Sequence, residues 1–207
     1  MFYKAIVFLP LVGAIAAGLF SLRKLDGAAV TVSIAGVCLS FILSCFAFGT
    51  IALGGEQATI DVARWIGSGS FQAHWTLRFD TLTAVMLIVV TGVSSCVHIY
   101  SVGYMHNDKS IARFMAYLSL FTFAMLMLVS ADNLVQLFFG WEGVGVASYL
   151  LIGFWHHKET AHTAAMKAFV VNRVGDFGFV LGILAIFALT GSVSFDAIFE
   201  TVSSYQP

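Results

Sequence analysis

The stretch FFGWEGVGVASYLLIGFW, residues 138–155, carries one charged side chain, Glu142, in an otherwise apolar run. Together with the apolar residues just before it, this run reaches the roughly 20 residues that an α-helix needs to cross a bilayer. A carboxylate near the middle of such a helix costs about 2.5–3.5 kcal/mol on insertion scales. The stretch therefore predicts a membrane-spanning helix, and it makes Glu142 a residue whose presence needs an explanation.

The composition of the whole chain favours a membrane protein. Of its 207 residues, 59% are hydrophobic and 10% are charged, whereas soluble domains carry roughly 25% charged residues. The net charge of −1 gives no electrostatic basis for binding nucleic acid. The charges cluster in short connectors, so we expect an all-α, polytopic bundle of about six transmembrane helices at residues 3–22, 28–53, 79–103, 112–131, 134–155 and 164–190.

The long connector, residues 54–78, reads differently from the apolar runs. Two partly alternating segments, ATIDVARWI and FQAHWTLRF, flank the turn-forming segment GSGS. This pattern predicts a short β-hairpin at the outer membrane surface, where Trp65 and Trp75 suit the headgroup level. Three cysteines lie inside predicted spans, without metal-ligand spacing, and are expected to be small buried hydrophobes: Cys38, Cys45 and Cys96.

The basic residues predict an orientation. Six of them fall in the first, third and fifth connectors, against three on the opposite side, Lys4, Arg64 and Arg78. Because basic residues favour the cytoplasmic side, both termini are expected on the outer face. The six that mark the inner side are Arg23, Lys24, Lys109, Arg113, Lys158 and Lys167.

Three charges lie deep inside predicted spans at similar depth: Glu142, Arg173 and Asp176. Arg173 and Asp176 are three residues apart, so their side chains neighbour one another on a helix. They have two interpretations. Arg173 and Asp176 can form a structural ion pair while Glu142 is a neutral hydrogen-bonded acid. Alternatively, the group carries protons, since burial raises the pKa of a carboxyl group and a nearby cation lowers it.

Histidines supply a candidate proton-entry group. His156, His157 and His162, with Lys167, lie near the inner ends of the fifth and sixth spans. A haem would need axial histidines that face each other from two helices, and only His98 lies within a span. Haem is therefore not expected.

Three segments resemble a known family. They are LRFDTLTAVMLIVVTGVSSCVHIYSVGYM, RFMAYLSLFTFAMLMLVSADNLVQLFFGWEGVGVASYLLIGFWHHK and AFVVNRVGDFGFVLG. They resemble the antiporter-like subunit L (chain 5) of respiratory complex I, NADH:quinone oxidoreductase. The GWEGVG and NRVGD blocks are specific when they occur together. The resemblance implies that Glu142 belongs to a proton channel in the membrane arm and that Arg173 and Asp176 are functionally important.

The resemblance also implies an organisation and partners. Residues 1–110 would form the first three helices, and residues 111–207 would begin the proton-translocating domain. The chain would then correspond to the N-terminal third of a subunit. In such a subunit, the seventh helix carries a lysine that partners the glutamate. This chain would hold no cofactor. NADH, FMN, iron–sulfur clusters and quinone would belong to partner subunits, and the other membrane-arm subunits, antiporter-like ones included, would be its partners in a bacterial or mitochondrial inner membrane.

Two alternatives remain open on sequence grounds. One is the large subunit of a multi-subunit cation/proton antiporter, which has no redox partner and uses the same glutamate. The other is a membrane scaffold in which the buried charges only fix the packing of helices.

The orientation is testable by cysteine labelling. In a chain without native cysteines, Lys109→Cys should react with a membrane-impermeant thiol reagent added from the inner side, because position 109 lies in an inner connector. Labelling of this position only from the outer side would contradict the predicted orientation.

Overall fold

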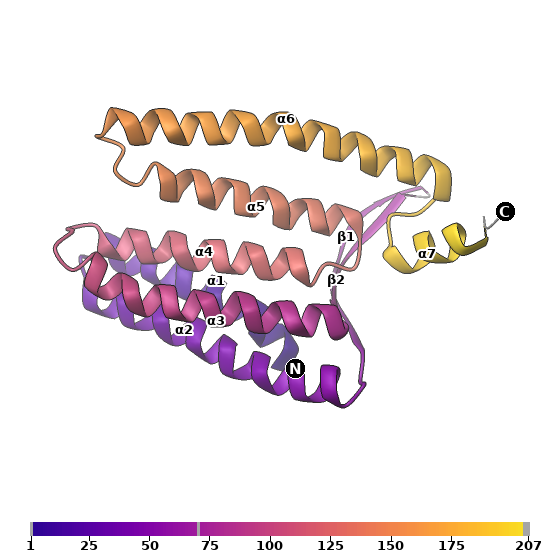
Figure 1. The fold of residues 1–207 in the computed structure, drawn as a ribbon, viewed down its shortest axis with the longest axis horizontal. Coiled ribbons are helices and arrows are strands. Elements are labelled where there is room, and N and C mark those ends of the chain that lie inside the picture. Colours follow the sequence, from indigo (N-terminus) through magenta and orange to yellow (C-terminus); the bar gives the residue numbers. More distant parts are fainter. Residues whose placement is uncertain (1, 70, 205–207) are drawn as a thin grey trace.

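A computed structural model describes residues 2–69 and 71–204 of the chain. In this part of the chain, long helices alternate with short connectors, and one β-hairpin separates the second and third long helices (Figure 1). The elements in chain order are α1 (Phe2–Leu22), α2 (Asp26–Phe48), the π-helical turn η1 (Gly49–Leu53), β1 (Ala58–Ser68), β2 (Phe71–Phe79), α3 (Thr81–Tyr104), α4 (Ile111–Val129), α5 (Leu134–Ile152), α6 (Glu159–Thr190) and α7 (Phe195–Ser204).

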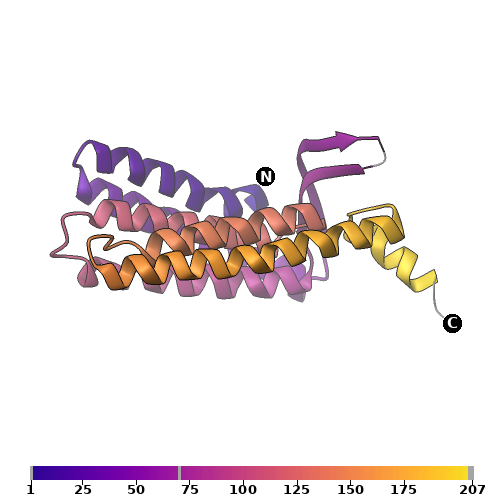
Figure 2. The ribbon, with the colours of Figure 1, turned by 90° about the horizontal axis from the view of Figure 1, so that it is seen from above.

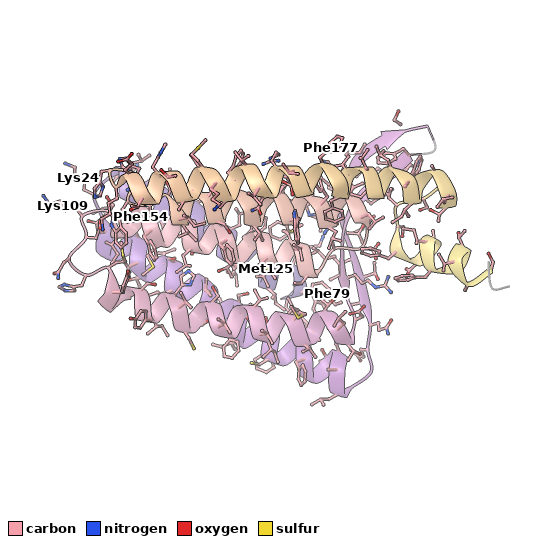
Figure 3. The ribbon with its side chains drawn as sticks, turned by 45° about the horizontal axis from the view of Figure 1, so that its top comes forward. Lys24, Phe79, Lys109, Met125, Phe154 and Phe177 are labelled. Atoms are coloured by element: carbon pink, nitrogen blue, oxygen red, sulfur yellow. The ribbon has the colours of Figure 1, made fainter. Side chains whose placement is uncertain are left out.

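The long helices form a bundle of four, to which α5 and then α6 are added at one edge. Helices α1 to α4 pack against one another, α5 packs on α4, and α6 packs on α5 at the edge of the bundle (Figure 1). The hairpin and α7 lie at one end, which we call the hairpin end (Figure 2). Lys24, Lys109 and Phe154 lie at the opposite end, which we call the basic end (Figure 3).

The prediction of about six membrane-spanning helices is confirmed, since six helices in the described residues are long and apolar enough to cross a membrane. The bounds differ in places. Helix α3 begins at Thr81 because the carboxylate of Asp80 accepts a hydrogen bond from the Thr83 backbone N–H at 2.8 Å and caps it. Helix α6 begins at Glu159, five residues earlier than expected. The short helix α7 was not predicted from the sequence.

Small and hydroxyl-bearing residues hold the first helices together. The Ser40 hydroxyl on α2 donates to the carbonyl of Ile6 on α1 at 2.6 Å. A Cβ atom on Gly36 would lie 3.1 Å from the carbonyl oxygen of Leu9, so glycine permits the close approach of α1 and α2. The buried hydroxyl groups are satisfied within the bundle, as an apolar environment requires.

The predicted hairpin is confirmed. Strands β1 and β2 pair antiparallel, with Ala58 opposite Phe79 and Ser68 opposite Phe71. The rings of Trp65 and Trp75 lie 5.2 Å apart and both contact Phe139 of α5. These aromatic contacts attach the hairpin to α5, and the headgroup depth of the two tryptophans stays a prediction.

Arg78 joins the elements at the hairpin end. Its guanidinium lies 2.5 Å from a carboxylate oxygen of Asp196 on α7, 3.4 Å from Asp80 and 3.6 Å from Asp132, which precedes α5. The hydrogen bond to Asp196 raises the pKa of Arg78 above its ordinary value. Burial raises the pKa of Asp132 above its ordinary value. One side chain therefore connects the hairpin, α3, α5 and α7.

The cysteine prediction is wrong for two residues. Cys38 is half-buried, but Cys45 and Cys96 are exposed on the outer faces of their helices. A membrane helix is apolar around its whole circumference, so a cysteine in such a helix can face lipid as readily as protein.

Two glycines set the position of α5. A Cβ atom on Gly140 would lie 2.6 Å from the Leu128 backbone of α4, and one on Gly143 would lie 2.9 Å from the Ala124 Cβ. Distances below 3.0 Å leave no room for a side chain. The glycine face of α5 is therefore pressed against α4, which leaves the neighbouring Glu142 free to turn toward α6.

Candidate functional site

The three deep charges meet between α5 and α6. The Arg173 Nη1 atom lies 2.5 Å and 2.6 Å from the two carboxylate oxygens of Glu142. The Arg173 Nε atom lies 3.7 Å from the Asp176 Oδ2 atom, one turn along the same helix. Glu142 is eight residues from the start of α5, or about 12 Å along its axis. The group therefore lies near the middle of the membrane-spanning region.

The sequence had suggested Arg173 and Asp176 as partners, and their pair is present but long. The shorter contact joins Arg173 to Glu142 on the other helix, which the sequence could not reveal. Both side chains remain accessible in the described chain, with exposed fractions of 48% for Arg173 and 22% for Glu142. The arginine thus has two carboxylate partners, one on each helix.

Asp176 is the most enclosed of the three, with 5% of its surface exposed. The indole N–H of Trp141 donates to its Oδ1 atom at 2.8 Å. The Trp141 ring stands edge-on to Phe179, with centroids 5.9 Å apart. Trp141 immediately precedes Glu142, so adjacent residues of α5 bind Asp176 and Arg173 of α6. Trp141 was not predicted from the sequence as a site residue, although a tryptophan donor beside a buried acid is a usable signal.

A cleft of about 190 Å³ opens beside this group. Polar atoms line it from Glu142, Ser148, Asn172, Arg173 and Asp176. A space of this size with several polar partners can hold ordered water. The arrangement therefore combines a carboxylate, its cation and room for water at mid-membrane depth.

The four residues predicted for proton entry, three histidines and Lys167, divide into two pairs. His156 and His162 line a second cleft of about 200 Å³ at the basic end, together with Arg113, Tyr117 and Tyr149. His157 and Lys167 are exposed but do not line this cleft. The structure thus brings two of the four predicted residues together.

A hydrogen bond orders the basic end next to this second cleft. The Trp155 indole N–H donates to the Asp108 carboxylate at 2.9 Å, which lowers the pKa of Asp108. The Lys158 ammonium lies 4.7 Å from the centre of the same indole ring. These contacts join the α3–α4 connector to the α5–α6 connector.

His98 belongs to a separate buried network among α2, α3 and α4. Its side chain is fully buried, with Nδ1 2.8 Å from the Ser94 carbonyl oxygen and Nε2 3.1 Å from the Ser119 hydroxyl. The Ser119 hydroxyl is also 2.6 Å from that of Ser33. Both ring nitrogens have protein partners. In the described residues, no group of three or more His, Cys, Asp or Glu side chains is placed to hold a metal ion.

Comparisons with known proteins identify the chain. Residues 65–115 match the family model for the N-terminus of NADH-ubiquinone oxidoreductase (complex I) chain 5. Residues 131–206 match the model for the transmembrane region of NADH:quinone oxidoreductase and Mrp antiporter subunits. NADH-quinone oxidoreductase subunit L of Rickettsia typhi is 53% identical over 94% of this chain. The chain belongs to the complex I subunit L/chain 5 family.

Other family members give the same result. Subunit L of Rhodobacter capsulatus is 54% identical over 95% of the chain, and NADH-ubiquinone oxidoreductase chain 5 of Arabidopsis thaliana is 54% identical over 97%. The chain spans about 30% of the length of these curated relatives and matches their N-terminal portion. Its relatives come from bacteria and from plants, and like them it is an integral membrane protein.

Solved structures share the fold beyond the family. A chain of the membrane-bound sulfane sulfur reductase, an archaeal respiratory membrane complex, superposes with a TM-score of 0.81 at 17% identity over 94% of this chain and 39% of that chain. A chain of the Mrp complex from Dietzia sp. superposes with a TM-score of 0.79 at 22% identity, over 100% of this chain and 22% of that chain. At these identities the likeness shows the fold alone.

The Trp141–Asp176 hydrogen bond is testable by a double-mutant cycle in the full-length protein. Trp141→Phe should destabilise it by about 1–3 kcal/mol, because a buried carboxylate loses its donor. In an Asp176→Ala background, which has no side-chain acceptor for the indole N–H, the same change should cost much less. Thermal unfolding of the solubilised protein measures both. Trp65→Phe, which removes an indole from an aromatic cluster, should have the same effect in both backgrounds. Equal costs of Trp141→Phe in the two backgrounds would show that the hydrogen bond contributes nothing.

Proposed function

We propose that this chain forms part of a proton-translocating membrane subunit of NADH:quinone oxidoreductase, in which Glu142 carries the proton and Arg173 and Asp176 control its release. The observation that supports this most strongly is the contact between the Arg173 guanidinium and both oxygens of the Glu142 carboxylate, between two membrane-spanning helices. A purely structural pair needs no access to water, whereas this one borders a polar cleft.

The physical basis is a change of partner. With Glu142 ionised, the arginine is held by a short, charge-assisted contact. A proton on Glu142 removes that attraction, and the Asp176 carboxylate, 3.7 Å from the Arg173 Nε atom, is the remaining acceptor. Moving the guanidinium toward Asp176 frees Glu142 to pass its proton on. The return of the arginine favours the ionised acid again. The three residues thus form a two-position switch.

Entry of the proton is assigned to the basic end. His156 and His162 line the cleft there, and an imidazole exchanges protons near neutral pH. His157 and Lys167 are exposed close by and complete the group that supplies this cleft. The same seam between α5 and α6 leads from the cleft toward Glu142.

The wider activity rests on family membership. The relatives are named as subunits of NADH-quinone and NADH-ubiquinone oxidoreductases, so we assign the oxidation of NADH, with FMN, iron–sulfur clusters and quinone, to partner subunits. Other membrane-arm subunits, antiporter-like ones included, are the proposed neighbours. We also propose residues 1–110 as the N-terminal helical unit and residues 111–207 as the beginning of the translocating domain.

The antiporter alternative has less support. One of the matching family models covers both complex I and Mrp antiporter subunits. However, the relatives from Rickettsia typhi, wheat, Arabidopsis, Marchantia and Rhodobacter, which are 50–54% identical, are NADH-quinone or NADH-ubiquinone oxidoreductase chains, while the Mrp complex chain is 22% identical.

The test is Glu142→Gln in the full-length subunit of an assembled complex. The amide keeps the size and hydrogen-bonding capacity of the side chain but cannot carry a proton. We expect loss of proton pumping and of coupled NADH-driven quinone reduction, measured in membranes, with normal assembly on native gels. Glu142→Asp should be milder, because it retains the carboxyl group.

Glu159→Gln is the matched control. It makes the same chemical change at an exposed position at the start of α6, the helix that carries Arg173, and pumping should be unchanged. Wild-type pumping by an assembled Glu142→Gln complex would exclude Glu142 as the proton carrier.

A further inference from the structure

We propose that Phe169 and Tyr149 form a closed aromatic gate between the basic-end cleft and the Glu142 cleft, and that Arg173 holds this gate shut. The proposal rests on the proposed function of Glu142 and adds the element that regulates access to it. It concerns the seam between α5 and α6, along which both clefts lie.

The two clefts are lined by different residues, and one residue from each lining is in contact with one from the other. Phe169 lines the cleft beside Glu142, and Tyr149 lines the cleft at the basic end. Their ring centroids lie 5.4 Å apart at an interplanar angle of 58°. An aromatic pair at this distance is in van der Waals contact and excludes water from the space between the rings. The pair therefore separates the two clefts.

The helices leave little space around the pair on its basic-end side. A Cβ atom on Gly153 would lie 3.2 Å from the Ala165 Cβ, so α5 and α6 are in close contact one turn beyond Tyr149. On the other side, Ser148 and Asn172 line the Glu142 cleft. A proton that follows the seam from His156 or His162 meets the aromatic pair before it reaches these polar side chains.

Arg173 connects the gate to the ion pair. Its guanidinium carbon lies 4.8 Å from the centre of the Phe169 ring, within cation–π range. The same guanidinium is bound to Glu142. Phe169 is therefore held between Tyr149 on one side and an arginine fixed by Glu142 on the other. When Glu142 is neutral and the arginine moves toward Asp176, Phe169 loses this support and the gate opens.

The charged and titratable groups around the pair are few. Glu142 from α5 and Arg173 and Asp176 from α6 face it on one side. On the other side it is faced by residues that line the basic-end cleft: Arg113 and Tyr117 from α4, and His156 and His162. Among these, only Arg173 contacts a gate ring through its charge. This geometry makes Glu142, through Arg173, the group that controls the gate.

The experiment measures access to the Glu142 cleft rather than pumping. In the full-length subunit of the assembled complex, with Cys38, Cys45 and Cys96 replaced by alanine, Ser148→Cys reports on this cleft. A small, membrane-impermeant cationic methanethiosulfonate is added from the basic side, and modification of this chain is followed with time. We expect slow labelling with the wild-type gate. Phe169→Ala should speed it about tenfold or more, because one aromatic pair and one cation–π contact are lost.

A second variant tests the link to Arg173 without touching the gate. Glu142→Gln should also speed the labelling of Ser148→Cys, because the amide no longer fixes the arginine. Leu150→Cys, in the basic-end cleft, is the matched control and should label quickly in every background. Phe169→Leu, which keeps an apolar side chain in place, serves if Phe169→Ala does not assemble, and it should also speed labelling.

Each outcome is decisive. Unchanged labelling of Ser148→Cys in the Phe169 variants, with Leu150→Cys still reactive, would overturn the gate. Faster labelling in the Phe169 variants but not in Glu142→Gln would overturn the control by Arg173. Failure of the proposed function is distinct, since it appears as normal pumping by Glu142→Gln whatever the labelling rates are.

Discussion

The contact between Glu142 and Arg173 is the interaction on which the rest of this structure depends. Each charge would cost several kcal/mol to bury alone in an apolar helix bundle, so each needs the other, and they lie on different helices. The pair therefore requires that α5 and α6 keep a fixed rotation and depth relative to each other. Gly140 and Gly143 provide this for α5, because any side chain there would collide with α4. Trp141 provides it for α6 by binding Asp176.

The ends of the bundle keep the two helices in register. At the hairpin end, Arg78 binds carboxylates from the beginning of α3, from the α4–α5 connector and from α7. At the basic end, the Trp155 indole binds Asp108 and joins two connectors. Between these fixed ends, α6 exposes a broad apolar face that includes Val170, Val174 and Phe177, the last of which is visible on the outer side of α6 (Figure 3). The site is thus supported from its ends and from α4, while the outer face of α6 makes no contact within the described residues.

Much of the fold could be predicted because a membrane-spanning helix is indicated by a continuous run of apolar residues, which is a local property of the sequence. Apolar runs of sufficient length located all six spans, and the alternation around GSGS located the hairpin. The site was found in part for the same reason, since a charge such as Glu142 in an apolar run is visible without a structure.

The partner of Glu142 was not visible in the sequence, because it depends on the rotation of α5 against α6. This rotation is set by glycines that contact another helix, α4. The outward direction of Cys45 and Cys96 was missed because an apolar stretch does not distinguish lipid from protein. The ion pairs of Arg78 with Asp132 and Asp196 were missed because these two acids are distant from Arg78 in the sequence.

The most direct test of the account is the protonation state of Glu142 itself. Infrared difference spectra between resting and turning-over complexes, compared for the wild-type and Glu142→Gln full-length subunits, isolate the signal of this side chain. The account predicts an ionised carboxylate at rest, where Arg173 binds both of its oxygens, and a protonated-carboxyl band that appears during turnover and is missing in Glu142→Gln. A spectrum in which the Glu142 carboxyl signal is the same at rest and during turnover would contradict the account.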